Sequence, residues 1–206
     1  MELEEEKRII DLCRKDPVYF GPIYDANFRK IFNYILHRVG NVALAEDLTA
    51  QTFIRAIDKL WQFKWKGISI SSWLYRLATN EVNSHYRKQK RNPIQYEDEV
   101  VERVPDLVRI NSELEQAEAD LSRKEIFNDL FKVIKSLKPT DQAVIVLRYF
   151  EKKSYAEIAE IIGKREATLR MQSKRALEKL KRKLSEQGIN NERYRETAAE
   201  YQDAFS

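Results

Sequence analysis

The sequence predicts an all-α protein made of two small helical domains joined by a linker, with a helix-turn-helix in the C-terminal domain. Only five Gly and five Pro interrupt its 206 residues, so breaks are few and the helices are long. Apolar residues recur at the three- and four-residue spacing of a helix face in several separate stretches. With 43% hydrophobic residues, the chain can also bury the cores that such domains need.

The composition argues against a disulfide-bonded, secreted or membrane-spanning protein. Cys13 is the one cysteine in the sequence, which excludes a disulfide within it and a thiolate metal cage, and fits a reducing, cytoplasmic environment. The start MELEEEKR is acidic where a signal peptide would be basic, and no apolar run reaches the length of a membrane span. We therefore expect no membrane insertion.

The N-terminal domain is expected over residues 23–92, after a leader of residues 1–22 that Pro17, Gly21 and Pro22 punctuate. Apolar periodicity and capping residues predict three helices in this domain. Their expected ranges are 23–39, 42–60 with Asn41 as the cap, and from a cap at Ser71 or Ser72 to Arg91.

The second of these helices carries a polar face opposite its apolar stripe. Four side chains recur there at spacings of four, four and three residues: Asp47, Gln51, Arg55 and Asp58. Such a face is most often solvated, and a partner-binding surface is the sharper alternative.

Aromatic and basic residues alternate in the segment before the third helix, which includes Trp65 and Lys66 and is predicted to be an ordered loop. Rings of this kind can stack on unpaired bases, although core packing is their commoner role. The third helix continues with amides and cations that suit base edges and phosphates. These residues are Arg76, Asn80, Asn83 and Arg87, with Lys88 beside them.

A linker is predicted over residues 93–121, because that stretch lacks helical periodicity, contains Pro105 and is rich in Asp and Glu. The C-terminal domain follows over residues 122–187, with a break and a new cap expected at Pro139-Thr140. Residues 188–206 form a tail without a strong pattern.

A helix-turn-helix is predicted from Ser154 to Leu184. Ser154 and Glu157 have the spacing of a capping box that begins a helix, and Gly163 can end that helix in the left-handed conformation. A second helical pattern resumes within a few residues and is strongly basic outside its apolar side. Such a cationic helix suits the major groove of DNA.

Two of these stretches resemble one family, the bacterial sigma factors of RNA polymerase in their extracytoplasmic-function form. The segments AEDLTAQTFIRAIDKL and SSWLYRLATNEVNSHYRKQKR resemble the second region of that family. The segment SLKPTDQAVIVLRYFEKKSYAEIAEIIGKREATLRMQSKRALEKLKRKL resembles the fourth region. The resemblance covers most of the chain, with the two regions in the expected order.

The resemblance implies a protein that directs core RNA polymerase to promoters. Asp47, Gln51, Arg55 and Asp58 would then face a coiled coil of the largest polymerase subunit. The minus-ten promoter element, once melted, would meet Trp65, Lys66, Arg76, Asn80, Asn83, Arg87 and Lys88. The minus-thirty-five duplex would meet the second helix of the helix-turn-helix, with Arg165, Glu166, Thr168, Met171 and Gln172 near base edges and Arg170, Lys174 and Arg175 on phosphates.

Lys164 also lies at this contact with the minus-thirty-five element. Lys164 and Arg165 stand where relatives commonly have an apolar residue and a capping Ser, and Ser173 replaces a larger apolar residue. The implied partners are core RNA polymerase and promoter DNA, with an anti-sigma factor as a further candidate.

Two other interpretations remain open. The chain could be a helix-turn-helix regulator whose N-terminal half is a sensor or dimerisation module, or a degenerate sigma-like protein that binds polymerase or an antagonist without directing initiation. An enzyme is not expected, because the sequence has no Gly-rich phosphate loop and no metal-ligand spacing, and His37 and His85 lie far apart. We therefore expect no cofactor and no metal.

Overall fold

The computed structural model of this protein describes residues 2–65, 67, 69–91 and 130–186. Every regular element in these ranges is a helix, which confirms the all-α prediction. The linker predicted over 93–121, the tail over 188–206 and Lys66 lie outside the described residues. None of the described helices combines the length and the apolar character needed to cross a lipid bilayer.

The N-terminal half is built on three packed helices, α2 (Gly21–Val39), α3 (Val42–Lys59) and α4 (Ile70–Arg91). Gly40 ends α2 in the left-handed conformation with a φ of 67°, and the Asn41 side chain caps α3 by accepting from the Leu44 N–H at 2.8 Å. Side chains that are wholly buried fill the space between the helices, and they include Ile23, Ile31, Ile35, Leu74, Ala78 and Val82. Removal of these apolar side chains from water is the main contribution to the stability of the N-terminal half.

The residues interpreted as a leader form α1 (Leu3–Cys13) and η1 (Pro17–Phe20), which pack on this core. Ile10, Cys13 and Phe20 are buried, and the ring of Phe20 meets that of Phe53 edge-on at 6.4 Å. This segment is therefore part of the folded N-terminal half.

The expected start of α4 at a Ser71 or Ser72 cap is wrong, because the helix begins at Ile70. The Ser69 hydroxyl accepts from the Ser71 N–H at 3.2 Å, and a carboxylate from α1 accepts from the first N–H of the helix. Oε1 of Glu6 accepts from the Ile70 N–H at 2.5 Å, and Oε2 accepts from the Ser69 hydroxyl at 2.9 Å. The first N–H groups of a helix lack partners within the helix, and a negative charge there also meets the positive end of the helix dipole. Glu6 is only 3% exposed.

Glu6→Ala is expected to lower the free energy of unfolding by about 2 kcal/mol, because it leaves a buried helix terminus without its acceptor. Glu5→Ala is the matched control, since Glu5 is the exposed neighbour on the same helix. Thermal and urea unfolding of the full chain would measure both. Equal stability of the two variants would contradict this role for Glu6.

The C-terminal half was predicted over residues 122–187, of which 122–129 and 187 lie outside the described residues. Its described part starts with helical backbone over residues 130–135 and continues through α6 (Pro139–Ile145), the π-helix η4 (Val146–Phe150), α7 (Tyr155–Ile162) and α8 (Glu166–Glu186). The break near Pro139 is confirmed, but the cap is Lys138 and Pro139 is the first helical residue. Proline suits that position because its missing N–H would have no helical partner.

The helix-turn-helix is confirmed in detail. The Ser154 hydroxyl accepts from the Glu157 N–H at 3.2 Å, and the Glu157 carboxylate accepts from the Ser154 N–H at 2.8 Å. Gly163 ends α7 with a φ of 76°. Burial alone would raise the pKa of Glu157, but hydrogen bonds from Ser154 and Lys153 outweigh it and the pKa is lowered. The capping box therefore stabilises the fold at neutral pH, and this contribution is lost as the pH falls through the lowered pKa.

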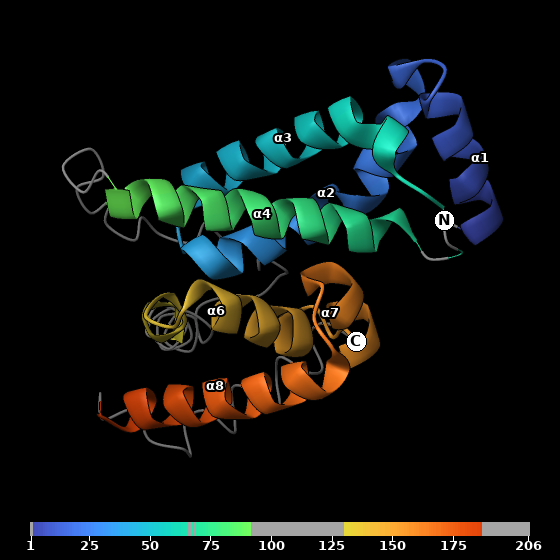
Figure 1. Cartoon of the computed structure of the whole chain (residues 1–206). Helices are drawn as coiled ribbons and strands as arrows, with labels where there is room; N and C mark the ends of the chain where they lie inside the picture. The colour runs from blue at the N-terminus through green and yellow to red at the C-terminus, as the bar shows by residue number, and fades with distance from the viewer. Residues whose placement is uncertain (1, 66, 68, 92–129, 187–206) are drawn as a thin grey trace, which may run out of the picture.

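The two halves lie side by side (Figure 1). Helix α7 packs against α4, and α6 lies between the N-terminal half and α8. Helix α8 is thus on the outer side of the C-terminal half, away from α4.

Candidate nucleic-acid and protein interfaces

The polar face of α3 is exposed along its length. Asp47, Gln51, Arg55 and Asp58 are all exposed. Arg55 has a partner within the chain, because its Nη1 lies 2.7 Å from Oε1 of Glu81 on α4, whose side chain is 4% exposed. A buried carboxylate is costly without a cation, so Arg55 also holds α3 to α4.

Two large apolar side chains on this face were missed from the sequence. Ile54 is 61% exposed and Trp61, just after α3, is 75% exposed. Positions 47, 51, 54, 58 and 61 follow one another at spacings of four, three, four and three, which places them on one stripe of a helix. A search for this four- and three-residue spacing among apolar residues, as well as among polar ones, would have found Ile54 and Trp61. Aromatic anchors of this kind dominate many protein interfaces.

The predicted amides and cations of α4 gather on the side that meets the C-terminal half. Arg76 and Asn80 are exposed and Asn83 is partly buried. Together with Gly163 and Lys164 of the helix-turn-helix they line a groove of about 350 Å³. The Asn83 carbonyl oxygen accepts from Nη2 of Arg38 at 2.9 Å, so its NH₂ group is the part left to meet another acceptor.

The remaining candidates of this half lie at the two ends of α4. Before the helix, η2 (Leu60–Gln62) leads into a segment that forms neither helix nor strand at its described positions, which confirms the predicted loop. There Phe63 is buried and Trp65 is half-buried, with ring centroids 6.4 Å apart. At the far end of the helix Arg87 and Lys88 are exposed.

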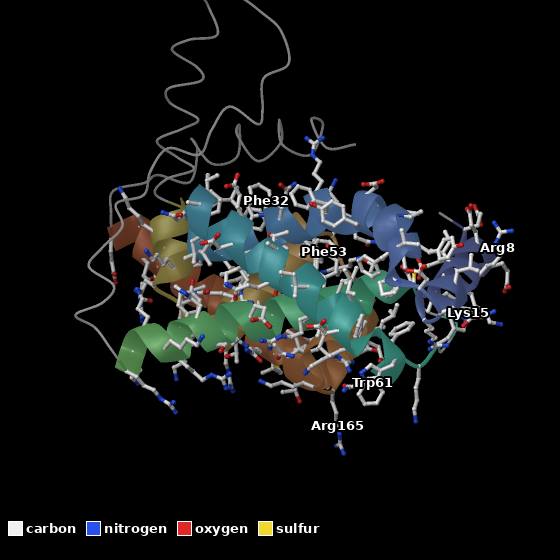
Figure 2. All side chains as sticks on the ribbon, turned by 90° about the horizontal axis from the view of Figure 1, so that it is seen from above. Arg8, Lys15, Phe32, Phe53, Trp61 and Arg165 are labelled. Atoms are coloured by element: carbon white, nitrogen blue, oxygen red, sulfur yellow. The ribbon has the colours of Figure 1, made fainter. Side chains whose placement is uncertain are left out.

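The structure fixes where the basic helix begins. Helix α8 starts at Glu166, and the carbonyl of Arg165 accepts from the Leu169 N–H at 3.1 Å, as a capping residue does. An arginine side chain has no acceptor, so it cannot cap the first N–H groups as Ser would. Figure 2 shows the Arg165 side chain extending away from the ribbon.

Most of the predicted DNA contacts on α8 and in the turn before it are exposed. Lys164, Arg165, Glu166, Thr168, Arg170, Met171, Lys174 and Arg175 are exposed. Gln172 is half-buried, because its NH₂ group donates to Asp141 at 2.9 Å and its carbonyl accepts from Lys164 at 3.3 Å. Ser173 is wholly buried and its hydroxyl lies 3.4 Å from that of Tyr149, which accounts for a polar residue at this position.

Arg170 is held in place by two neighbours. Its guanidinium lies 4.6 Å over the ring of Tyr155 and 3.5 Å from the carboxylate of Glu166. Arg148 lies 5.0 Å from the same ring. Stacking on an aromatic face leaves the guanidinium edge free to hydrogen-bond a phosphate.

Arg165→Ser is expected to raise the free energy of unfolding by about 1 kcal/mol, since Ser supplies the missing cap. The same change should weaken binding to a minus-thirty-five duplex at least about fivefold, because the resemblance places Arg165 on that duplex. Arg182→Ser is the control, because it removes an exposed arginine from the other end of α8. Thermal unfolding and fluorescence anisotropy would measure the two effects. Unchanged duplex affinity would remove Arg165 from the interface.

Comparison with known proteins identifies both halves. Residues 23–92 match Sigma-70 region 2, and residues 127–180 match Sigma-70, region 4. The sigma factor SigW of Bacillus subtilis is 31% identical over 187 residues, which cover 89% of this chain and 98% of SigW. The sigma factor BldN of Streptomyces coelicolor is 31% identical over 166 residues, which are 80% of this chain and 60% of BldN.

A solved structure has the same fold. It is that of the sigma factor RpoE in complex with the anti-sigma factor NepR from Bartonella quintana, with a TM-score of 0.59 and 24% identity, covering 81% of this chain and 96% of RpoE. The likeness at this identity concerns the fold, and the family rests on the two matched regions and on SigW. The chain belongs to the sigma-70 family and is a sigma factor of the extracytoplasmic-function (ECF) type.

Proposed function

We propose that this chain directs core RNA polymerase to specific promoters. The α3 face (Asp47, Gln51, Arg55 and Asp58) binds polymerase, the α4 face (Arg76, Asn80 and Asn83) captures the melted minus-ten strand, and α8 reads the minus-thirty-five duplex. The observation that carries the proposal is that one chain holds both sigma regions in order, each with an exposed face of suitable chemistry.

The chain favours opening of the DNA strands because some of its contacts can form only with melted DNA. The amides of Asn80 and Asn83 can hydrogen-bond the edges of unpaired bases, and the half-buried ring of Trp65 can stack on one. Because duplex DNA hides these edges, each such contact shifts the equilibrium from closed to open DNA. Arg87 and Lys88, with Lys66, add attraction to phosphates, which weakens as the salt concentration rises.

The residues of α8 suit particular base edges. An arginine such as Arg165 pairs best with guanine, an amide such as Gln172 with adenine, and an apolar side chain such as Met171 with the methyl of thymine. Gln172 reaches a base by exchanging its bond to Asp141 for one to DNA. Glu166 and Thr168 line the same face, while Arg170, Lys174, Arg175 and Lys164 meet the backbone.

The chain carries out this role in the cytoplasm, without catalytic chemistry of its own. Its partners are core polymerase and promoter DNA, and an anti-sigma factor is a further candidate, supported by the RpoE–NepR complex. A regulator that uses the helix-turn-helix alone is not favoured, because residues 23–92 match a sigma region instead of a sensor or dimerisation module.

Selection of genomic DNA fragments tests the proposal. The chain is mixed with fragments in the presence and absence of core polymerase, and the retained DNA is sequenced. With polymerase present we expect enrichment of fragments that share two motifs at a fixed spacing, whereas the chain alone should enrich no more than the minus-thirty-five motif. Equal enrichment by the chain alone would instead support the regulator.

A further inference from the structure

The amide of Gln172 on α8 is held at both ends by charged side chains. Its NH₂ group donates to Oδ1 of Asp141 at 2.9 Å, and its carbonyl oxygen accepts from Nζ of Lys164 at 3.3 Å. The opposite orientation of the amide would face its carbonyl oxygen to the carboxylate and its NH₂ group to the ammonium, so two acceptors and two donors would meet. Asp141 and Lys164 together therefore fix the direction in which the amide points.

The bond to Asp141 is the harder of the two to break. The Asp141 side chain is only 12% exposed, and Nζ of Lys179 lies 3.6 Å from its other carboxylate oxygen. Lys164, by contrast, is exposed on the turn before α8, where water can replace it. A hydrogen bond to a charged group is stronger where solvent is excluded. A ligand that takes the Gln172 amide must therefore displace chiefly Asp141.

The position of Gln172 on α8 explains why its amide meets Asp141. Leu169 and Ala176, three residues before it and four after it, are wholly buried, so Gln172 borders the buried side of the helix. Lys179 follows seven residues later on the same side, and both side chains reach Asp141 on α6, which packs against α8 (Figure 1). Gln172 must turn away from α6 to meet a base.

A base that suits the amide has to compete with Asp141, and a base that does not suit it is unaffected. Adenine offers N7 as an acceptor and N6–H as a donor, which match the two ends of an amide. At any other base Gln172 keeps its bond to Asp141, so binding there has no added cost. Competition with Asp141 therefore weakens binding to the matching base pair alone, and it reduces the difference in affinity between base pairs.

We propose that Asp141 sets the base selectivity of α8, because it holds Gln172 back from DNA and so lowers the preference for the base pair that Gln172 reads. The proposal rests on the function proposed above, which assigns Gln172 to the minus-thirty-five duplex. In this role Asp141 is a positioning residue that acts through Gln172. A chain without this carboxylate should be more selective than the wild type, whereas the loss of a merely structural contact would not sharpen selectivity.

The test uses holoenzyme made from core polymerase and the full chain, with promoter fragments that differ only at single base pairs of the minus-thirty-five element. Competition binding of labelled fragments gives the affinities, and Gln172→Ala first identifies the base pair at which the preference shrinks. Asp141→Ala should raise the wild-type preference at that base pair about tenfold, because the matching base no longer competes with a charge-assisted hydrogen bond. Asp141→Asn keeps a neutral acceptor of the same shape and should give a smaller rise.

A double variant separates this effect from the general gain in DNA attraction that follows the loss of a negative charge. Gln172→Ala combined with Asp141→Ala should change the affinity for all four fragments at that base pair by one common factor, with no change in preference. Glu178→Ala is the matched single control, because Glu178 is an exposed carboxylate on α8 and its loss removes the same charge. It should likewise leave the preference unchanged. Thermal unfolding shows whether each variant is folded.

Three results would overturn the proposal while wild-type holoenzyme still selects promoters, so that the proposed function stands. They are an unchanged or reduced preference in folded Asp141→Ala, a sharper preference that persists in the double variant, and a wild-type preference at every base pair in Gln172→Ala. Should Asp141→Ala not fold, an unchanged preference in Asp141→Asn decides in the same way. A wild-type holoenzyme that prefers no fragment over another would count against the proposed function, and the proposal about Asp141 would fall with it.

Discussion

Asp47→Arg is expected to weaken binding of the chain to core RNA polymerase by at least about tenfold, because a reversed charge in a matched interface meets repulsion instead of attraction. Asp47 is exposed on α3, at the start of the stripe that continues through Gln51, Ile54, Asp58 and Trp61. The side chain makes no structural contribution that would confuse the result, since an exposed residue on a helix surface tolerates substitution.

The matched control is Glu46→Arg. Glu46 is also exposed and acidic, but it lies about 100° round the helix from Asp47. Titration of labelled chain with core polymerase should separate the two variants, while both retain the affinity of the wild type for a minus-thirty-five duplex. Equal polymerase affinity for Asp47→Arg and Glu46→Arg would take Asp47 out of the interface.

Asn80→Ala is expected to slow or prevent strand opening more than it weakens the closed complex. The amide can contact only bases that are already unpaired, so its loss raises the free energy of the open state selectively. Losing one good base contact costs about 1–3 kcal/mol, which corresponds to about a fivefold to hundredfold smaller open fraction.

Permanganate reactivity of unpaired thymines measures opening, and retention of duplex promoter on the holoenzyme at low temperature measures the closed complex. Gln89→Ala is the control, because Gln89 follows Asn80 by nine residues and so lies on the opposite side of α4. A parallel loss in both measurements for Asn80→Ala would show that Asn80 contributes to binding in general and has no special part in opening.

Local signals in the sequence predict local structure well in this chain. The capping box of Ser154 and Glu157 and the glycine at Gly163 act within one turn of helix, and both form as expected. The amphipathic stripes likewise predict α2 and α3 closely, because burying a helix face needs only the spacing of its own apolar residues.

Features that join distant segments could not be read in this way. At the start of α4, the Ser69 hydroxyl is a local cap, but the Ile70 N–H donates to Glu6, 64 residues earlier in the chain, and the sequence around Ser71 gives no sign of that contact. Docking of α7 on α4 likewise depends on single contacts such as that of Tyr75 with Glu151, 76 residues apart. The start of α8 is also not evident from the sequence, because the residue at the capping position is Arg165, whose side chain cannot cap a helix.

The roles of the candidate site residues stay a prediction, but the structure shows the surroundings of their side chains. Most of the predicted polar residues lie exposed on the expected faces, whereas Arg55 turns out to hold Glu81 and Gln172 to hold Asp141. Ile54 and Trp61 were not assigned to this face because only its polar residues were considered as partner contacts.

Promoter-dependent transcription by a reconstituted holoenzyme tests the central claim most directly. Core RNA polymerase, a promoter fragment selected with this chain and the four nucleotides are incubated with and without the purified full-length protein. We expect a run-off transcript of defined length only when polymerase and chain are both present, and we expect its loss when the minus-ten element is scrambled. Absence of any such transcript, while the chain still binds the duplex, would contradict the account.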